Sequence, residues 1–183
     1  MFTIALFIIP ILTMRLLSED KRQKVDQALF TAPVKLTSVV LGKFLAAFAV
    51  YAIAFAPTII FEIIIMTYVT VNVFTYLYAL LGILLLGSAL IAIGMFISAL
   101  TESQIIAGIF GLAVSFFIMQ IDYFATAVGL EWFKSICTAV SFITRYNAFT
   151  AGQLDFSNCV FFISVTAMFI YFTYVSFDKK RWA

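Results

Sequence analysis

Long stretches without a charged residue dominate the chain, and short polar stretches separate them. Residues 1–14, 44–61, 63–101 and 156–177 contain no Asp, Glu, Lys or Arg. A helix needs about 20 apolar residues to cross the roughly 30 Å of hydrocarbon in a bilayer. The pattern therefore predicts an all-α protein built as a polytopic bundle of transmembrane helices.

The longest charge-free stretch must turn within itself. As one helix, residues 63–101 would extend about 58 Å, nearly twice the hydrocarbon thickness. The polar and β-branched residues at 67–75 are the predicted turn. We therefore predict a single transmembrane domain, residues 1–183, with about five spans at 1–17, 41–67, 76–100, 104–126 and 156–177.

Two further segments connect these spans. Residues 18–40 are rich in charge, and residues 129–155 mix charged and aromatic residues, which is typical of a re-entrant or interfacial helix. Nine of the eleven Lys and Arg residues fall within residues 15–43 and 179–181, so the positive-inside rule predicts that these segments and the C-terminus are cytoplasmic. Residues 129–155 are then outside. Five spans also put residue 1 outside, which leads us to expect a further span before it.

Composition agrees with a membrane protein and excludes several other classes. Mean hydropathy is +1.14, with 64% hydrophobic and 11% charged residues, whereas soluble domains contain about 25% charged residues. A net charge of +2 is too small to indicate a nucleic-acid partner. With no histidine and only Cys137 and Cys159, the chain offers no metal site and no disulfide framework. These two thiols are either free or form one bridge.

No motif for catalysis or nucleotide binding occurs in the sequence. Gly42-Lys43 is followed by Phe44, and the glycine that a phosphate-binding loop requires further upstream is missing. No paired-carboxylate or Ser/His pattern occurs within the spans. We expect no catalytic residue, no metal and no cofactor in this chain.

The polar segment contains a candidate amphipathic helix. Val25, Ala28 and Leu29 lie at i, i+3 and i+4 with charged residues opposite, and Pro33 stops the pattern. Such a helix can dock on another protein, or it can be a solvated loop that skims the lipid surface. Periodicity alone does not decide between the two.

Several runs resemble one family of membrane proteins. PILTMRLLSEDKRQ at 10–23 and LFTAPV at 29–34 resemble the first cytoplasmic loop of type-2 ABC transporter permeases, more narrowly the bacterial branch related to gliding-motility permeases. LGKF at 41–44, FISALTESQI at 96–105 and KKRW at 179–182 fit the same family at matching intervals.

The resemblance implies a permease subunit of the cytoplasmic membrane with six spans, both ends cytoplasmic, working as a homo- or heterodimer with two ABC ATPase subunits. It would export a substrate by alternating access, with ATP bound by the partner subunit. By this resemblance we expect that the family's first span is missing from the chain, so the alternative is a truncated, non-transporting fragment or assembly subunit that pairs with a full-length permease. The helix that couples to the ATPase would comprise Glu19, Lys21, Arg22, Val25, Asp26, Ala28 and Leu29.

Two carboxylates lie within predicted spans, Glu62 in the second and Asp122 in the fourth. A charge at the bilayer centre costs about 2.5–3.5 kcal/mol on insertion scales, so such residues usually face a cavity or a partner. Both are candidates for the translocation pathway. Alternatively they reach the headgroups or carry a proton, which is the reading we favour for Asp122.

Glycines recur within the third and fourth predicted spans, at residues 82, 87 and 94 and at residues 108 and 111. Small residues let transmembrane helices approach closely, so we predict helix contacts there. Trp132, Phe133 and Trp182 are predicted interface anchors.

Overall fold

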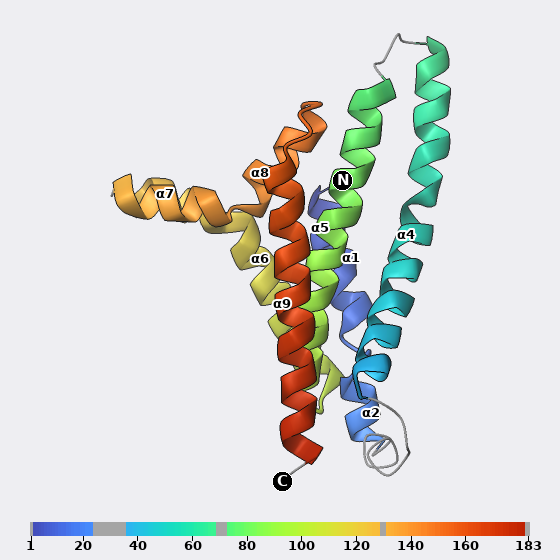
Figure 1. Ribbon diagram of the computed structural model, residues 1–183, viewed down its shortest axis with the longest axis vertical. Coiled ribbons are helices and arrows are strands. Elements are labelled where there is room, and N and C mark those ends of the chain that lie inside the picture. The colour runs from blue at the N-terminus through green and yellow to red at the C-terminus, as the bar shows by residue number, and fades with distance from the viewer. Residues whose placement is uncertain (1, 24–35, 69–72, 129–130, 182–183) are drawn as a thin grey trace.

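The computed structural model describes residues 2–23, 36–68, 73–128 and 131–181. Within these ranges the chain is helical and contains no strand, which confirms the predicted all-α bundle. In these ranges five helical stretches are long and apolar enough to cross a membrane, as predicted; the first of them is Phe2–Arg22, which includes both α1 and α2. The helices, drawn in Figure 1, are α1 (Phe2–Thr13), α2 (Ser18–Arg22), α4 (Leu36–Tyr68), α5 (Val73–Leu100), α6 (Gln104–Val128), α7 (Glu131–Val140), α8 (Phe142–Thr150) and α9 (Phe156–Arg181).

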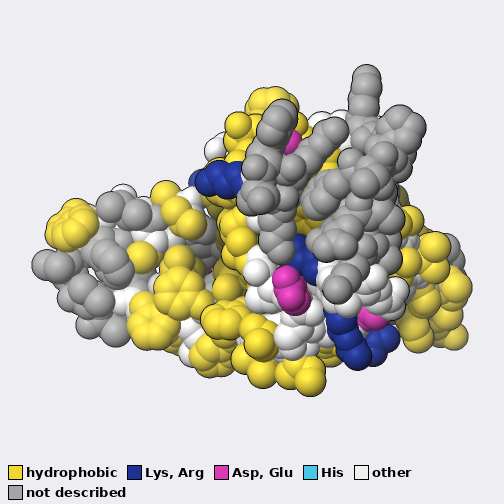
Figure 2. Space-filling view, turned by 90° about the horizontal axis from the view of Figure 1, so that it is seen from below, with side chains coloured by type: hydrophobic (Ala, Val, Ile, Leu, Met, Phe, Trp, Pro, Cys, Tyr) yellow, Lys and Arg dark blue, Asp and Glu magenta, His cyan; other side chains and the backbone are white. Residues whose placement is uncertain are grey.

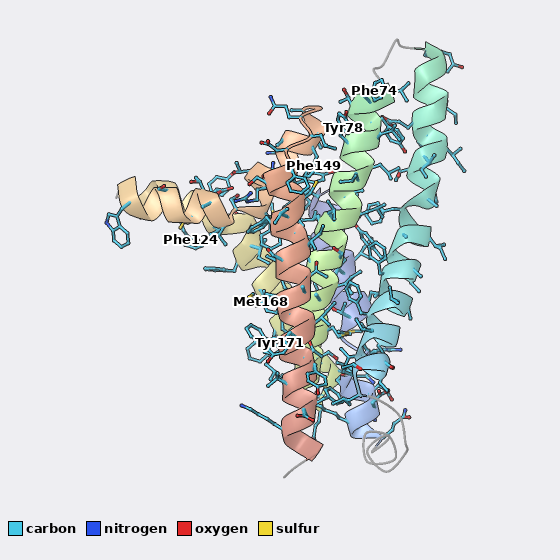
Figure 3. The ribbon with its side chains drawn as sticks, viewed as in Figure 1. Phe74, Tyr78, Phe124, Phe149, Met168 and Tyr171 are labelled. Atoms are coloured by element: carbon cyan, nitrogen blue, oxygen red, sulfur yellow. The ribbon has the colours of Figure 1, made fainter. Side chains whose placement is uncertain are left out.

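The central helix of the bundle is α5, which contacts α1, α4, α6, α8 and α9. A helix that is apolar on every side is buried in protein or lipid, and α5 is buried in protein at Leu86, Ile91 and Met95. The other spans leave large apolar side chains exposed, among them Met168 and Tyr171 on α9 (Figure 3). These exposed residues are the surface that a bilayer would solvate.

Glycines set the closest approaches to α5. A Cβ atom added at Gly87 would collide with the ring of Tyr51 on α4, and one at Gly82 would collide with Phe149 on α8. Figure 3 shows Phe149 lying between α8 and α5. Gly94 faces Thr13 of α1 in the same way. The predicted packing role of these glycines is confirmed.

The boundaries of α4 differ from the predicted second span. This helix begins at Leu36 rather than at residue 41, and its 33 residues extend about 50 Å at 1.5 Å per residue. It ends at Tyr68, and α5 begins at Val73, so residues 63–101 belong to two helices; the centre of the predicted turn, 69–72, lies outside the described residues. Pro57 lies inside α4, where it removes one backbone hydrogen bond and favours a bend.

The predicted outer element, residues 129–155, contains two short helices. In Figure 1, α7 extends sideways from the bundle, whereas α8 runs alongside α5. Ser141 separates the two helices and caps α8, because its hydroxyl accepts a hydrogen bond from Thr144 N at 3.1 Å. Gly152 follows α8 with φ +78°, a left-handed conformation that favours glycine.

Candidate functional sites at the two ends of the bundle

Polar side chains are concentrated at the two ends of the bundle. The α2 end comprises α2, the start of α4 and the final turns of α5 and α9; the α8 end comprises α8, the last turns of α4 and the start of α5. Figure 2 views the molecule from the α2 end, where basic and acidic side chains lie in several separate groups among hydrophobic ones.

Ser98 of α5 holds the turn between α1 and α2. Its hydroxyl accepts hydrogen bonds from the backbone N–H groups of Leu17 and Ser18, at 3.1 and 3.0 Å. It donates one to the carbonyl of Met14 at 3.2 Å. The first N–H groups of a helix have no partner within that helix, and the α2 N-terminus lacks a side-chain cap of its own. A residue 80 positions away in sequence therefore caps α2.

Lys21 of α2 is buried against two other helices. Its ammonium group donates a hydrogen bond to the carbonyl of Ala99, in the last turn of α5, where carbonyl groups lack partners and carry partial negative charge. The same ammonium lies 5.4 Å from the centre of the Phe177 ring on α9, within cation–π range. Lys21 is one of the predicted coupling residues, but its ammonium group binds other helices of this chain.

Lys43 joins α4 to the same turn. Its ammonium group pairs with the Asp20 carboxylate and donates to the carbonyl of Leu16 at 2.6 Å. Glu19 and Arg22 are not buried, and the Glu19 carboxylate accepts a hydrogen bond from Gln23 at 2.6 Å. The remaining predicted coupling residues, Val25, Asp26, Ala28 and Leu29, lie outside the described residues.

At the α8 end, the inner face of α4 changes from aromatic to polar. One stripe of this helix, with spacings of four and three residues, contains Phe44, Phe48, Tyr51, Phe55, Thr58 and Glu62. Its four aromatic rings contact one another in sequence, with centroids 6.3, 6.5 and 4.6 Å apart. Residues at such spacings share one helix face. Glu62 therefore continues a stripe that faces the bundle.

Glu62 lines a cavity of about 220 Å³ between α4, α5 and α8. We call it the Glu62 cavity; its lining residues are Thr58, Glu62, Tyr76, Ala79, Leu80, Ile83, Tyr146 and Thr150. The Tyr76 hydroxyl is buried without a hydrogen-bond partner. Burial raises the pKa of Tyr146 above its usual value near 10, so this hydroxyl keeps its proton at neutral pH.

Asp122 does not line the Glu62 cavity. Its carboxylate accepts hydrogen bonds from the hydroxyls of Ser141 at 2.6 Å and Thr144 at 3.4 Å. Asp122 therefore joins α6 to the start of α8. No sequence pattern indicates this partnership, because Ser141 lies 19 residues away, outside the predicted span that contains Asp122.

A larger apolar groove of about 770 Å³ lies between α4, α5 and α9. The hydroxyls of Ser88 and Thr166 in its wall have partners: they lie 3.2 Å apart, and each also donates to a carbonyl of its own helix. Tyr78 also lines the groove, and the other lining residues are apolar. In contrast, the Glu62 cavity combines a carboxylate with an unpartnered hydroxyl.

The described residues contain no cluster of three or more Cys, Asp or Glu side chains that could hold a metal ion. Cys137 on α7 and Cys159 on α9 are both free thiols. Of the two alternatives that the sequence left open, the structure has the unpaired one.

A family model described as ABC-2 family transporter protein matches residues 1–176. The chain belongs to the ABC-2 transporter family. It is thus a multi-pass membrane component of an ABC transporter, in a family that carries out transport rather than catalysis and normally works with an ABC ATPase. Comparisons with curated proteins and with solved structures gave no match. The resemblance to type-2 ABC permeases is confirmed; the gliding-motility branch and the absent first span remain predictions.

Proposed function

We propose that this chain is the permease subunit of an ABC exporter whose separate ATPase docks on α2 and the residues that follow it. The α2 end and the C-terminus would lie in the cytoplasm, in line with the basic residues there. ATP would be bound by the ATPase, and the permease would pair with a second permease, identical or related, in the cytoplasmic membrane. Export by alternating access is the transport mode that this arrangement supports.

One observation carries the proposal: α2 is joined to three spans at once. Ser98 and Lys21 connect it to α5, Lys21 also reaches α9, and Lys43 connects the same turn to α4. A loop that only skims a membrane has no need of buried contacts to several helices. A loop that transmits a conformational change from an ATPase to the spans needs such buried contacts, because rigid elements transmit a displacement to the helices they contact.

The docking hypothesis predicts that Leu29→Asp abolishes co-purification with the ATPase. Leu29 belongs to the apolar face predicted from sequence, and a charge in a buried contact can cost about 2 kcal/mol or more at a hot spot. The chain would be co-expressed with each ABC ATPase of the source genome, purified in mild detergent, and assayed for bound ATPase and ATP hydrolysis.

Leu154→Asp is the matched control, since Leu154 is an exposed leucine at the opposite end of the bundle. This variant should retain its ATPase at wild-type stoichiometry. Retention by Leu29→Asp would refute docking at this segment. Failure of the wild-type chain to retain any ATPase would favour the alternative, an assembly subunit that pairs with a full-length permease.

A further inference from the structure

The Glu62 cavity has the shape of a site for a small group. Binding sites for drug-sized molecules occupy about 300–1,000 Å³, and this cavity has about 220 Å³. It can therefore hold a small molecule or the charged head of a larger one. Its walls come from three helices, and Thr58, Glu62 and Tyr76 supply polar groups from α4 and α5.

The charge in this cavity is not balanced by the part of the chain that the structure describes. The ion pair found among these residues joins Lys43 to Asp20 at the opposite end. Arg145, on the helix that forms one wall, binds Ala139 and Asn158 instead and lies over the Phe161 ring at 4.2 Å. Its guanidinium is thus committed elsewhere, and Glu62 faces the cavity with no basic partner among the described residues.

Two aromatic residues in the wall of the Glu62 cavity are also suited to a cation. Tyr76 and Tyr146 line the cavity beside Glu62, and aromatic rings attract cations through their negative faces. The Tyr76 hydroxyl, which lacks a partner, can accept a hydrogen bond from an N–H group or donate one to an oxygen. A carboxylate with two tyrosines is a combination that suits an organic ammonium group.

We propose that the Glu62 cavity binds an organic ammonium group, either of a small amine or of a lipid headgroup. Glu62 balances the positive charge, and Tyr76 and Tyr146 surround it. If the chain transports, this group belongs to the substrate class. Binding is a property of the chain alone, so it can be tested without an ATPase.

The test is equilibrium dialysis of radiolabelled choline against the purified chain in nanodiscs of phosphatidylglycerol, which has no ammonium group. We expect saturable binding to the wild-type chain. Glu62→Gln should weaken it at least tenfold, about the effect of losing one charge-assisted contact. Asp155→Asn, which removes an exposed carboxylate at the start of α9, should bind as the wild type does.

Two further measurements distinguish the effect of the ligand's charge from the effect of its shape. An excess of 3,3-dimethylbutan-1-ol, a neutral molecule with the shape of choline, should not displace the label. Tyr76→Phe keeps the ring and removes a hydroxyl that can bond only to the alcohol group of choline, which has no N–H group, so it should weaken binding by only about two- to fivefold. Loss of choline binding in nanodiscs of phosphatidylcholine would identify a lipid headgroup as the occupant, and retention would identify a free amine.

The proposal fails if the wild-type chain does not bind choline, if Glu62→Gln binds it equally well, or if the neutral alcohol competes as strongly as unlabelled choline. None of these outcomes affects ATPase docking at the α2 end. Conversely, loss of docking in Leu29→Asp leaves ammonium binding untouched, so the two hypotheses fail separately.

Discussion

The polar groups of the α2 end and those of the Glu62 cavity differ in whether they have partners, whereas the rest of the α8 end is also bonded: Ser141 binds Asp122, and Arg145 binds Ala139 and Asn158. At the α2 end, the buried side chains of Ser98 and Lys21 bind backbone groups of neighbouring elements, and Lys43 pairs with Asp20. At the α8 end, Glu62 and the Tyr76 hydroxyl face a cavity without a partner among the described residues.

This difference between partnered and unpartnered polar groups indicates what each end can do. A fully satisfied polar network makes a region rigid, whereas an unsatisfied group in a water-poor setting retains its capacity to bind something else. The α2 end is therefore suited to transmit force, and the α8 end to receive a ligand. Removing polar groups from the two ends should have unequal effects on stability.

The largest loss of stability is expected for Ser98→Ala. The substitution leaves two buried N–H groups without an acceptor, and each unsatisfied group costs about 1–3 kcal/mol. Thermal unfolding in mild detergent should show a destabilisation of about 2 kcal/mol or more. Ser164→Ala is the control, because Ser164 is exposed and its hydroxyl bonds only within its own helix. Equal melting temperatures for the two variants would contradict the capping role.

A smaller loss is expected for Lys21→Met. Methionine keeps the apolar stem but loses the ammonium contacts to Ala99 and to the Phe177 ring, worth about 1–2 kcal/mol together. The same unfolding assay should leave Lys179→Met near wild type, since Lys179 is exposed on α9. If Lys21→Met and Lys179→Met had the same melting temperature, the contacts of Lys21 would contribute nothing to stability.

The smallest effect on stability is expected for Glu62→Gln. Because no described residue binds the Glu62 carboxylate, its neutralisation removes no contact, and the change should stay within about 0.5 kcal/mol. A destabilisation above about 1 kcal/mol would reveal a structural partner for Glu62 and would remove the contrast between the two ends. Measured beside Ser98→Ala, this variant tests the comparison directly.

Periodicity and hydropathy predicted the spans and the glycine contacts, because both depend on local sequence and on the thickness of the bilayer. They did not predict Ser98 as a cap, because its partners lie about 80 positions away. The burial of Lys21 was also missed, since lysine is almost never fully buried unless it is paired. The early start of α4 was missed as well: the predicted span begins at residue 41, whereas the helix begins at Leu36. Lys43 lies near the start of this helix, and its ammonium binds Leu16 and Asp20.

The Glu62 cavity could be predicted in part. The spacing of the aromatic stripe on α4 already assigns Glu62 to the same face as Tyr51 and Phe55. What the sequence could not supply was the identity of the opposite wall. Tyr146 belongs to a segment predicted only as an outer element, and it lies 84 residues beyond Glu62 in the chain (146 − 62).

The contact between Tyr51 and Gly87 has a mechanical consequence. The tyrosine ring occupies the space that a Cβ atom of Gly87 would need, and its hydroxyl donates to the carbonyl of Ile83 at 2.8 Å. If α4 moves as one rigid helix, this contact is a pivot about which it would tilt rather than slide along α5. The arms measure about 22 Å to Leu36 and about 17 Å to Glu62, at 1.5 Å per residue. A pull of about 2 Å at the α2 end would thus swing Glu62 about 1.5 Å the opposite way, so that closing one side of the bundle opens the other.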